Sequence, residues 1–177
     1  MYSRLVGSEM CIRDRGREAL IIDPVIEHSD EYSTILKNLD LKLVKVIDTH
    51  IHADHISALN ELNKRTNCIR VMGEKSKSEV IDLRIKDGEK INVEEVELQA
   101  IYTPGHTDCS YSFLMNDRVF TGDTLLINGS GRTDFQNGNA YDAYDSIFNK
   151  LLKLPEKTLV FPAHDYNGKK FSTIENE

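Results

Sequence analysis

Four short apolar runs along the chain end alike, because histidine or aspartate follows each of them within a few residues. Glycine or proline accompanies these exits, as a tight turn from strand to loop requires. In open α/β sheets ligands bind at the carboxyl ends of the strands. We therefore expect the four ends to meet in one site. The runs and their polar residues are 43–47 with His50, His52, Asp54 and His55, 98–101 with His106, 118–120 with Asp123, and 159–161 with His164.

The rest of the pattern alternates between strands and helices, which predicts one α/β domain over residues 16–177 with mixed sheets covered by helices. Further strands are expected at 18–22 and 69–72, a hairpin at 111–114 and 118–121, and helices at 30–39 and 56–64. The strongest helix spans 140–152 behind Asn139 as N-cap. The face expected in the core comprises Ala140, Ala143, Tyr144, Ile147, Phe148 and Leu151.

The first fifteen residues show neither a helical nor a strand period and do not lead into the pattern that follows. We therefore expect residues 1–15 to be a foreign or disordered leader. The domain itself then starts at residue 16.

Composition excludes several classes of protein. A net charge of −7 argues against a nucleic-acid-binding protein. No apolar run approaches the roughly 20 residues of a membrane span. Three cysteines without CxxC spacing favour reduced thiols, and thus a cytoplasmic protein or, in a eukaryote, one of the mitochondrial matrix. Neither a Walker loop nor a GxSxG elbow is present, and the charged stretch 74–79 is expected to be solvated surface.

The histidines indicate a metal site. Five of the six lie at the strand exits, while His28 falls in a polar loop. One such histidine alone would more often be a hydrogen-bonded, partly buried residue. Imidazoles and carboxylates gathered from several loops are what a metal centre requires.

The segment from Thr49 to His55 resembles the THxHxDH signature of the metallo-β-lactamase superfamily. The resemblance implies an αββα sandwich with a metal site at one edge. A dinuclear member would hold one metal with His50, His52 and His106 and the other with Asp54, His55 and His164, and Asp123 would bridge them. The strands that usually precede 18–22 and a tail after Glu175 are missing from the pattern, so we expect a fold truncated at both ends.

Segments 120–127, 131–138 and 161–166 resemble the persulfide dioxygenases, which are related to glyoxalase II. This resemblance implies sulfide oxidation, in which glutathione persulfide and O₂ yield sulfite and glutathione. It also implies one Fe(II) per chain, with His50, His106 and Asp123 as metal-binding and catalytic residues. Two histidines and one carboxylate leave open positions for sulfur and O₂. The remaining candidates then orient ligands or water, or bind a second metal: His52, Asp54, His55 and His164.

Two other interpretations stay open. One is a glyoxalase II-like hydrolase of hydroxyacylglutathione thioesters with two zinc ions per chain. The other is a catalytically silent domain that binds metal only structurally. The sequence does not determine the oligomeric state, and a homodimer is one alternative.

Arg132 and Tyr166 are the substrate-binding candidates of the motif. Arginine suits the carboxylates of a glutathione-like substrate, and a tyrosine hydroxyl can donate to a carboxylate or a sulfur. Each residue has an alternative role that is only structural. Arg132 could pair with Asp134, and Tyr166 could act only in packing. Ser130 stands where the family commonly has cysteine, so no thiol chemistry is assigned there, and Cys109 is expected to be a small buried residue.

Overall fold

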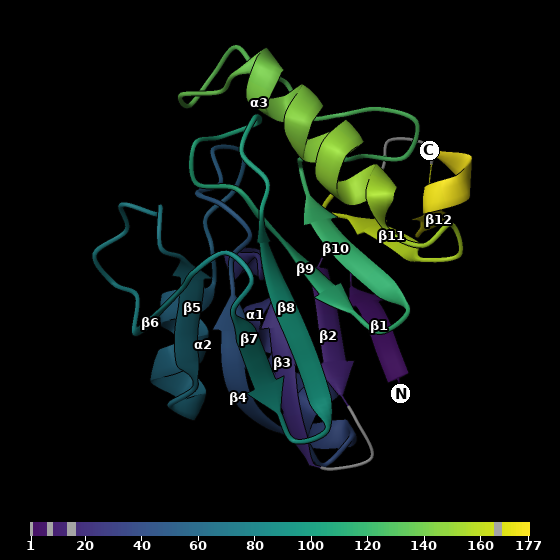
Figure 1. The fold of residues 1–177 in the computed structure, drawn as a ribbon. Helices are drawn as coiled ribbons and strands as arrows, with labels where there is room; N and C mark the ends of the chain where they lie inside the picture. The colour runs from purple at the N-terminus through teal and green to yellow at the C-terminus, as the bar shows by residue number, and fades with distance from the viewer. Residues whose placement is uncertain (1, 7–8, 14–16, 165–167) are drawn as a thin grey trace.

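The computed structural model describes residues 2–6, 9–13, 17–164 and 168–177, and its strands form two six-stranded sheets. The sheets pack face to face, and helices cover both outer faces (Figure 1). This αββα sandwich confirms the predicted fold class. No helix in these ranges is long and apolar enough to cross a membrane.

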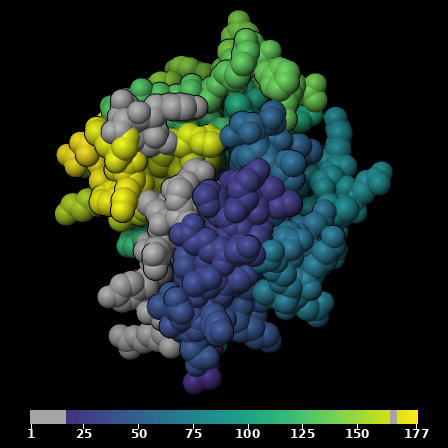
Figure 2. Space-filling view, turned by 180° about the vertical axis from the view of Figure 1, so that it is seen from behind, coloured from purple at the N-terminus to yellow at the C-terminus, as the bar shows by residue number. Residues whose placement is uncertain are grey.

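The first sheet holds six strands in chain order, and its strands from the third to the sixth run parallel. Helices α1 (Ser29–Asn38) and α2 (Leu59–Thr66) cover its outer face. Seen from behind, the purple-to-blue segment that includes these helices fills the middle of the molecule (Figure 2). The strands are β1 (Tyr2–Val6), β2 (Glu9–Arg13), β3 (Glu18–Ile22), β4 (Lys42–Ile47), β5 (Ile69–Gly73) and β6 (Leu83–Ile85).

The central strands of this sheet are buried on both faces. In β3, Ala19 and Ile21 pack with α1 and α2, whereas Leu20 and Ile22 pack against the second sheet. Successive side chains of a strand point to opposite faces, so one apolar run serves both layers. This explains why the strand appears in the sequence as a continuous apolar run rather than an alternating one.

The second sheet has the strand order β12-β11-β10-β9-β8-β7. Strands β10 and β11 are parallel, while the β8–β9 and β9–β10 pairs are antiparallel. Strands β8, β10 and β11 therefore point the same way and deliver their carboxyl ends to one edge. The strands are β7 (Lys90–Val93), β8 (Val96–Tyr102), β9 (Tyr111–Met115), β10 (Arg118–Gly122), β11 (Leu159–Pro162) and β12 (Ser172–Thr173).

One helical segment covers the outer face of the second sheet (Figure 1). It begins as α3 (Ala140–Tyr144), continues as the π-helical η2 (Asp145–Lys150) and ends in the 3₁₀ turn η3 (Leu151–Lys153). The two other short turns are η1 (Ile26–His28) and η4 (Ile174–Asn176).

The described N-terminal residues are strands rather than disordered, while a foreign origin of residues 1–15 stays a prediction. Residues 2–6 and 9–13 form β1 and β2, and β2 pairs antiparallel with β3, with residue 10 opposite Ile22. The expected absence of strands before 18–22 is corrected by the same observation. Backbone hydrogen bonds form this pairing, so it can occur without a periodic pattern of apolar side chains. Because β2 pairs with β3, β3 is not an exposed edge of the sheet.

The predicted helix at 140–152 forms, but its expected core face is only partly correct. Asn139 caps it as predicted, accepting hydrogen bonds from two backbone N–H groups, and Ala143, Ile147 and Leu151 are buried. Tyr144 and Phe148 are instead 61% and 47% exposed. From Asp145 the helix bonds residue i to i+5, so the residues that follow, Phe148 among them, depart from the face that a 3.6-residue period predicts.

Candidate metal centre

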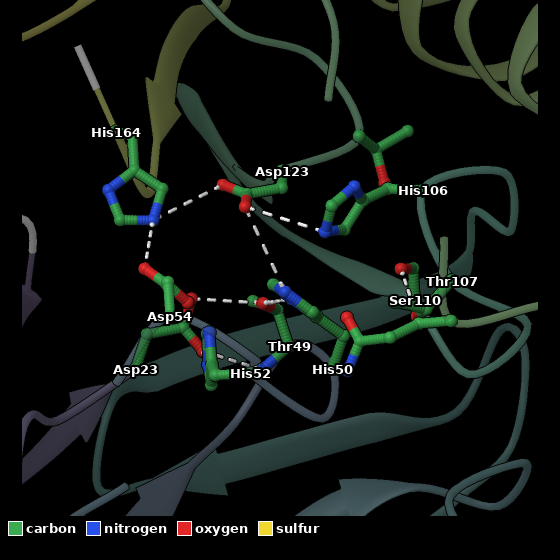
Figure 3. Close-up of polar contacts among 12 residues, drawn as sticks. Asp23, Thr49, His50, His52, Asp54, His106, Thr107, Ser110, Asp123 and His164 are labelled. Carbon is green, nitrogen blue, oxygen red and sulfur yellow. Dashed lines mark hydrogen bonds and ion pairs between the residues drawn. The ribbon is translucent and has the colours of Figure 1, made fainter. Parts of the chain in front are cut away.

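The four strand ends meet as predicted. The loop after β4 carries His50, and the ends of β8, β10 and β11 deliver His106, Asp123 and His164 to the same place (Figure 3). Asp123 lies between the three histidines, and its carboxylate is within 3.9 Å of a ring nitrogen of each.

His50, His106 and Asp123 form one group of candidate ligands. One ligand atom from each residue lies within 4.8 Å of the others. Nε2 of His50 is 3.9 Å and Nε2 of His106 is 3.6 Å from Oδ2 of Asp123. These separations exceed direct hydrogen bonds, so the three atoms face a shared space rather than satisfy one another.

A chain of hydrogen bonds fixes the ring of His50. The Thr49 hydroxyl donates its single hydrogen to the Asp23 carboxylate at 2.9 Å, because a carboxylate only accepts. The same hydroxyl lies 2.9 Å from Nδ1 of His50 and must therefore accept a hydrogen from that nitrogen. This tautomer leaves the lone pair on Nε2, the atom that faces Asp123.

His106 reaches the same tautomer through a different partner. Its Nδ1 lies 2.8 Å from the backbone carbonyl of Arg132, which can only accept. The loop comes this close because Gly131 has no side chain: a Cβ there would lie 2.2 Å from the Asp123 carbonyl oxygen and 2.7 Å from Nδ1 of His106. The Nε2 lone pair of His106 is thereby directed at Asp123 as well.

This environment fits a metal cation. Burial, reinforced by the neighbouring His52, lowers the pKa of His50 to about 3, so its imidazole stays neutral. Burial raises the pKa of Asp123, and its Oδ1 has no hydrogen-bond partner among the described residues. A divalent ion bound by these residues would supply positive charge to a buried carboxylate that faces two imidazole lone pairs.

His52 is turned toward Asp23. Its Nε2 lies 3.1 Å from Oδ1 of that carboxylate. Burial favours the neutral ring, but the attraction of Asp23 outweighs it and raises the pKa of His52 to about 9. Burial alone would raise the pKa of Asp23. The attraction and the hydrogen bond of His52 outweigh burial, and the pKa of Asp23 is lowered.

The other predicted residues form a second group beside the first. Asp54 contacts Nδ1 of His55 at 3.3 Å and Nε2 of His164 at 3.1 Å. Ligand atoms of His52, Asp54 and His55 lie within 4.8 Å of one another. Nδ1 of His52 and Nε2 of His55 are buried without a hydrogen-bond partner in the described part of the chain.

Asp23 was not among the site residues predicted from the sequence. This residue binds the backbone N–H and the hydroxyl of Thr49 as well as His52, so it supports the whole signature loop. The signal was present, because Asp23 and Pro24 follow the apolar run 18–22 just as His and Asp follow the four other runs.

The substrate-binding candidates have different outcomes. The Arg132 side chain is exposed and donates to both carboxylate oxygens of Asp134, at 2.8 and 3.0 Å. It also lines a cavity of about 350 Å³ that opens onto His106, Asp123 and His164. Tyr166 lies outside the described residues. Cys109 is buried, as expected.

The fold and the site define a metal-dependent protein of the metallo-β-lactamase type. The chain belongs to the metallo-beta-lactamase superfamily, whose family model matches residues 10–164. Within that superfamily it is a member of the persulfide dioxygenase family, as the following similarities show.

The mitochondrial persulfide dioxygenase ETHE1 of Mus musculus is 40% identical over 179 residues, covering 99% of this chain and 68% of the mouse protein. The crystal structure of ETHE1 from Myxococcus xanthus superimposes with a TM-score of 0.96 at 43% identity, covering 99% of this chain and 80% of that one. A hydroxyacylglutathione hydrolase of Dictyostelium discoideum is more distant, at 29% identity over 181 residues, 96% of this chain and 67% of that protein.

Proposed function

We propose that the chain is a sulfur dioxygenase that binds one Fe(II) and oxidises glutathione persulfide with O₂ and water to sulfite and glutathione. The observation that carries the proposal is the convergence of two Nε2 lone pairs and one carboxylate, each imidazole fixed through its other nitrogen. The persulfide dioxygenase relatives support the same reaction.

His50, His106 and Asp123 would hold the metal. Fe(II) held by these residues would supply the electron transfer that O₂ chemistry needs, and a set of only three protein ligands would leave room for the substrate. The Asp23–Thr49 chain and the Arg132 carbonyl would keep both imidazoles in the ligating tautomer.

The other residues would prepare the cavity for the substrate. The Asp54–His164 pair, joined at 3.1 Å, lines the cavity beside Asp123 and can hold a proton or orient water there. Leu126 and Phe135 supply apolar surface to the same cavity, which suits the weakly hydrated persulfide sulfur. Arg132 lies at the rim of this cavity. Its exposed ion pair with Asp134 is weak, so a carboxylate of the substrate could replace Asp134.

A second candidate is the dinuclear zinc hydrolase of hydroxyacylglutathione thioesters. The group formed by His52, Asp54 and His55 favours it, since two of its buried ring nitrogens have no hydrogen-bond partner among the described residues. A second metal would use these residues, whereas the dioxygenase needs them only to orient ligands or water.

Metal content and oxygen consumption together test the proposal. Protein purified without oxygen should contain one iron per chain and consume O₂ with glutathione persulfide, forming sulfite. His50→Ala should lose both iron and activity, and the matched control His28→Ala, outside the site, should retain both. Two zinc ions per chain, hydrolysis of S-D-lactoylglutathione and no O₂ consumption would overturn it, and iron without any activity would favour the silent domain.

We also propose that the enzyme works in a reducing compartment, the cytoplasm or the mitochondrial matrix of a eukaryote. Cys68 and Cys109 are free, buried thiols, as expected where disulfides do not form. The acidic net charge argues against nucleic acid as a partner, and a homodimer is the oligomer to test by light scattering.

A further inference from the structure

A second cavity, of about 170 Å³, adjoins the metal centre on the side of the loop that follows β5. Its lining includes Ile51, next to the ligand His50, and Thr107, next to the ligand His106. Gln136 lines both this cavity and the metal cavity, and its side chain donates to the Ile51 carbonyl at 3.1 Å. The two cavities are therefore neighbours that share one wall.

The two lysines of this cavity come from the stretch 74–79, which was expected to be solvated surface. Lys75 and Lys77 line it together with Asp108. Lys77 lies 3.6 Å from the Asp108 carboxylate, and Lys75 lies 3.3 Å from that of Glu74. Exposed ion pairs of this kind contribute only about 0–1 kcal/mol, so a ligand carboxylate can replace them.

The cavity is built on fixed backbone. Arg84 donates to the carbonyls of Ser76, at 2.6 Å, and Ser78, which holds the lysine-bearing loop. On the opposite wall Gln136 and Asn137 both have positive φ, 46° and 58°. Such conformations cost of order 1 kcal/mol or more for a residue other than glycine, and they cluster at ligand-binding sites.

Two ammonium groups beside one carboxylate and two side-chain amides match a particular chemistry. An α-amino acid group carries a carboxylate and an ammonium on one carbon, so it needs cationic and anionic partners side by side. The Asn137 amide donates to Asp108 at 3.2 Å and holds that carboxylate in place. In glutathione, the γ-glutamyl end is such a group, and the glycine end is not, because it has a carboxylate alone.

We infer that this cavity binds the γ-glutamyl end of the thiol substrate, with Lys75 and Lys77 on its α-carboxylate and Asp108 on its α-ammonium. The inference rests on the proposed function and specifies which end of glutathione persulfide enters here. It makes the three residues determinants of specificity, because they contact the substrate far from its reacting sulfur. Arg132, at the rim of the metal cavity, is left for the other carboxylate.

Calorimetric titration of the iron-loaded protein with thiols, without oxygen, tests the inference directly. The double variant Lys75→Met/Lys77→Met should bind glutathione and γ-glutamylcysteine at least about tenfold more weakly, because it loses both charge-assisted contacts with the α-carboxylate. Its affinity for cysteinylglycine, which lacks the γ-glutamyl group, should be unchanged. Lys90→Met, on β7 and paired with Glu97, is the matched control and should alter none of these affinities.

A second variant separates the two charges of the ligand. Asp108→Asn should weaken the binding of glutathione several-fold and leave N-acetylglutathione, which has no ammonium group, unaffected. Equal effects of these substitutions on all the thiols, or no effect on any, would overturn the inference.

Steady-state kinetics distinguish this inference from the proposed function. Oxygen consumption with an unchanged KM for glutathione persulfide in the double lysine variant would refute the subsite and leave the dioxygenase intact. Absence of oxygen consumption with every persulfide, together with lysine-dependent glutathione binding, would refute the dioxygenase and support the subsite.

Discussion

Replacing Asp48 by asparagine should stabilise the metal-free protein at alkaline pH. Asp48 directly follows β4 and is only 4% exposed. Burial raises the pKa of its carboxyl from 3.8 to about 7, the nearby Asp23 adds to this, and His52 and a hydrogen bond with Ser57 oppose it. Its Oδ1 has no hydrogen-bond partner among the described residues.

The sign and size of the effect follow from linkage. Because the folded-state pKa is raised, the folded protein holds the Asp48 proton more tightly than the unfolded chain does. The contribution of the Asp48 proton to stability is therefore fully present below pH 3.8 and is lost as the pH rises to about 7. The interval between those pKa values corresponds to ~4 kcal/mol at 1.36 kcal/mol per pKa unit. Asparagine resembles the protonated acid and avoids this cost.

Thermal unfolding at two pH values measures the effect. At pH 8 the variant Asp48→Asn should gain up to ~4 kcal/mol, or ~8–16 °C in Tm for a chain of this size. At pH 4.5 only ~1 kcal/mol is expected, because the wild-type carboxyl is then largely protonated when folded. Asp82→Asn is the control: Asp82 is exposed, its pKa is lowered to about 2 by Arg70, and its loss should not stabilise the protein. Equal gains at both pH values, or a loss at pH 8, would refute the reasoning.

Two further predictions concern the ligands and their loops. Thr49→Val removes the hydroxyl between Asp23 and His50 and should weaken metal binding about 10–100-fold in a chelator competition, while Thr49→Ser retains most of the affinity. Gly105→Ala should lower the free energy of unfolding by more than about 2 kcal/mol, because φ is +143° and a Cβ would lie 2.3 Å from a backbone atom of α3. Gly88→Ala, at φ +77° with nothing within 4 Å of its Cβ, should cost less in the same denaturation assay, and equal losses would contradict the steric argument.

Much of the site could be predicted because strand ends leave a local signal. A buried run followed by His or Asp identifies a strand exit, and parallel strands bring such exits to one edge. Asp23 gives the same signal after the run 18–22, but no histidine follows that run closely, as one does at three of the four other exits. Its importance arises only when β3 and β4 pair and place it beside Thr49.

Other features depend on tertiary structure that local patterns do not encode. Tyr144 and Phe148 fit a helical core face by spacing, yet both are exposed where α3 gives way to the π-helical η2. Lys75 and Lys77 look like ordinary surface charges, and only the approach of the loop around Gln136 makes them walls of a cavity. Contacts between segments far apart in the chain decide both cases.

The contact between His106 and the main chain of Arg132 joins metal affinity to the shape of the loop that contains this arginine. A substitution of the Arg132 side chain keeps this backbone carbonyl. The hydrogen bond to His106 is therefore lost only if the substitution moves the backbone. Coupling of this kind is reciprocal: whatever favours the present loop conformation tightens metal binding, and the metal favours that conformation to the same degree. Protection of the loop amides from hydrogen exchange should therefore report whether the metal is bound.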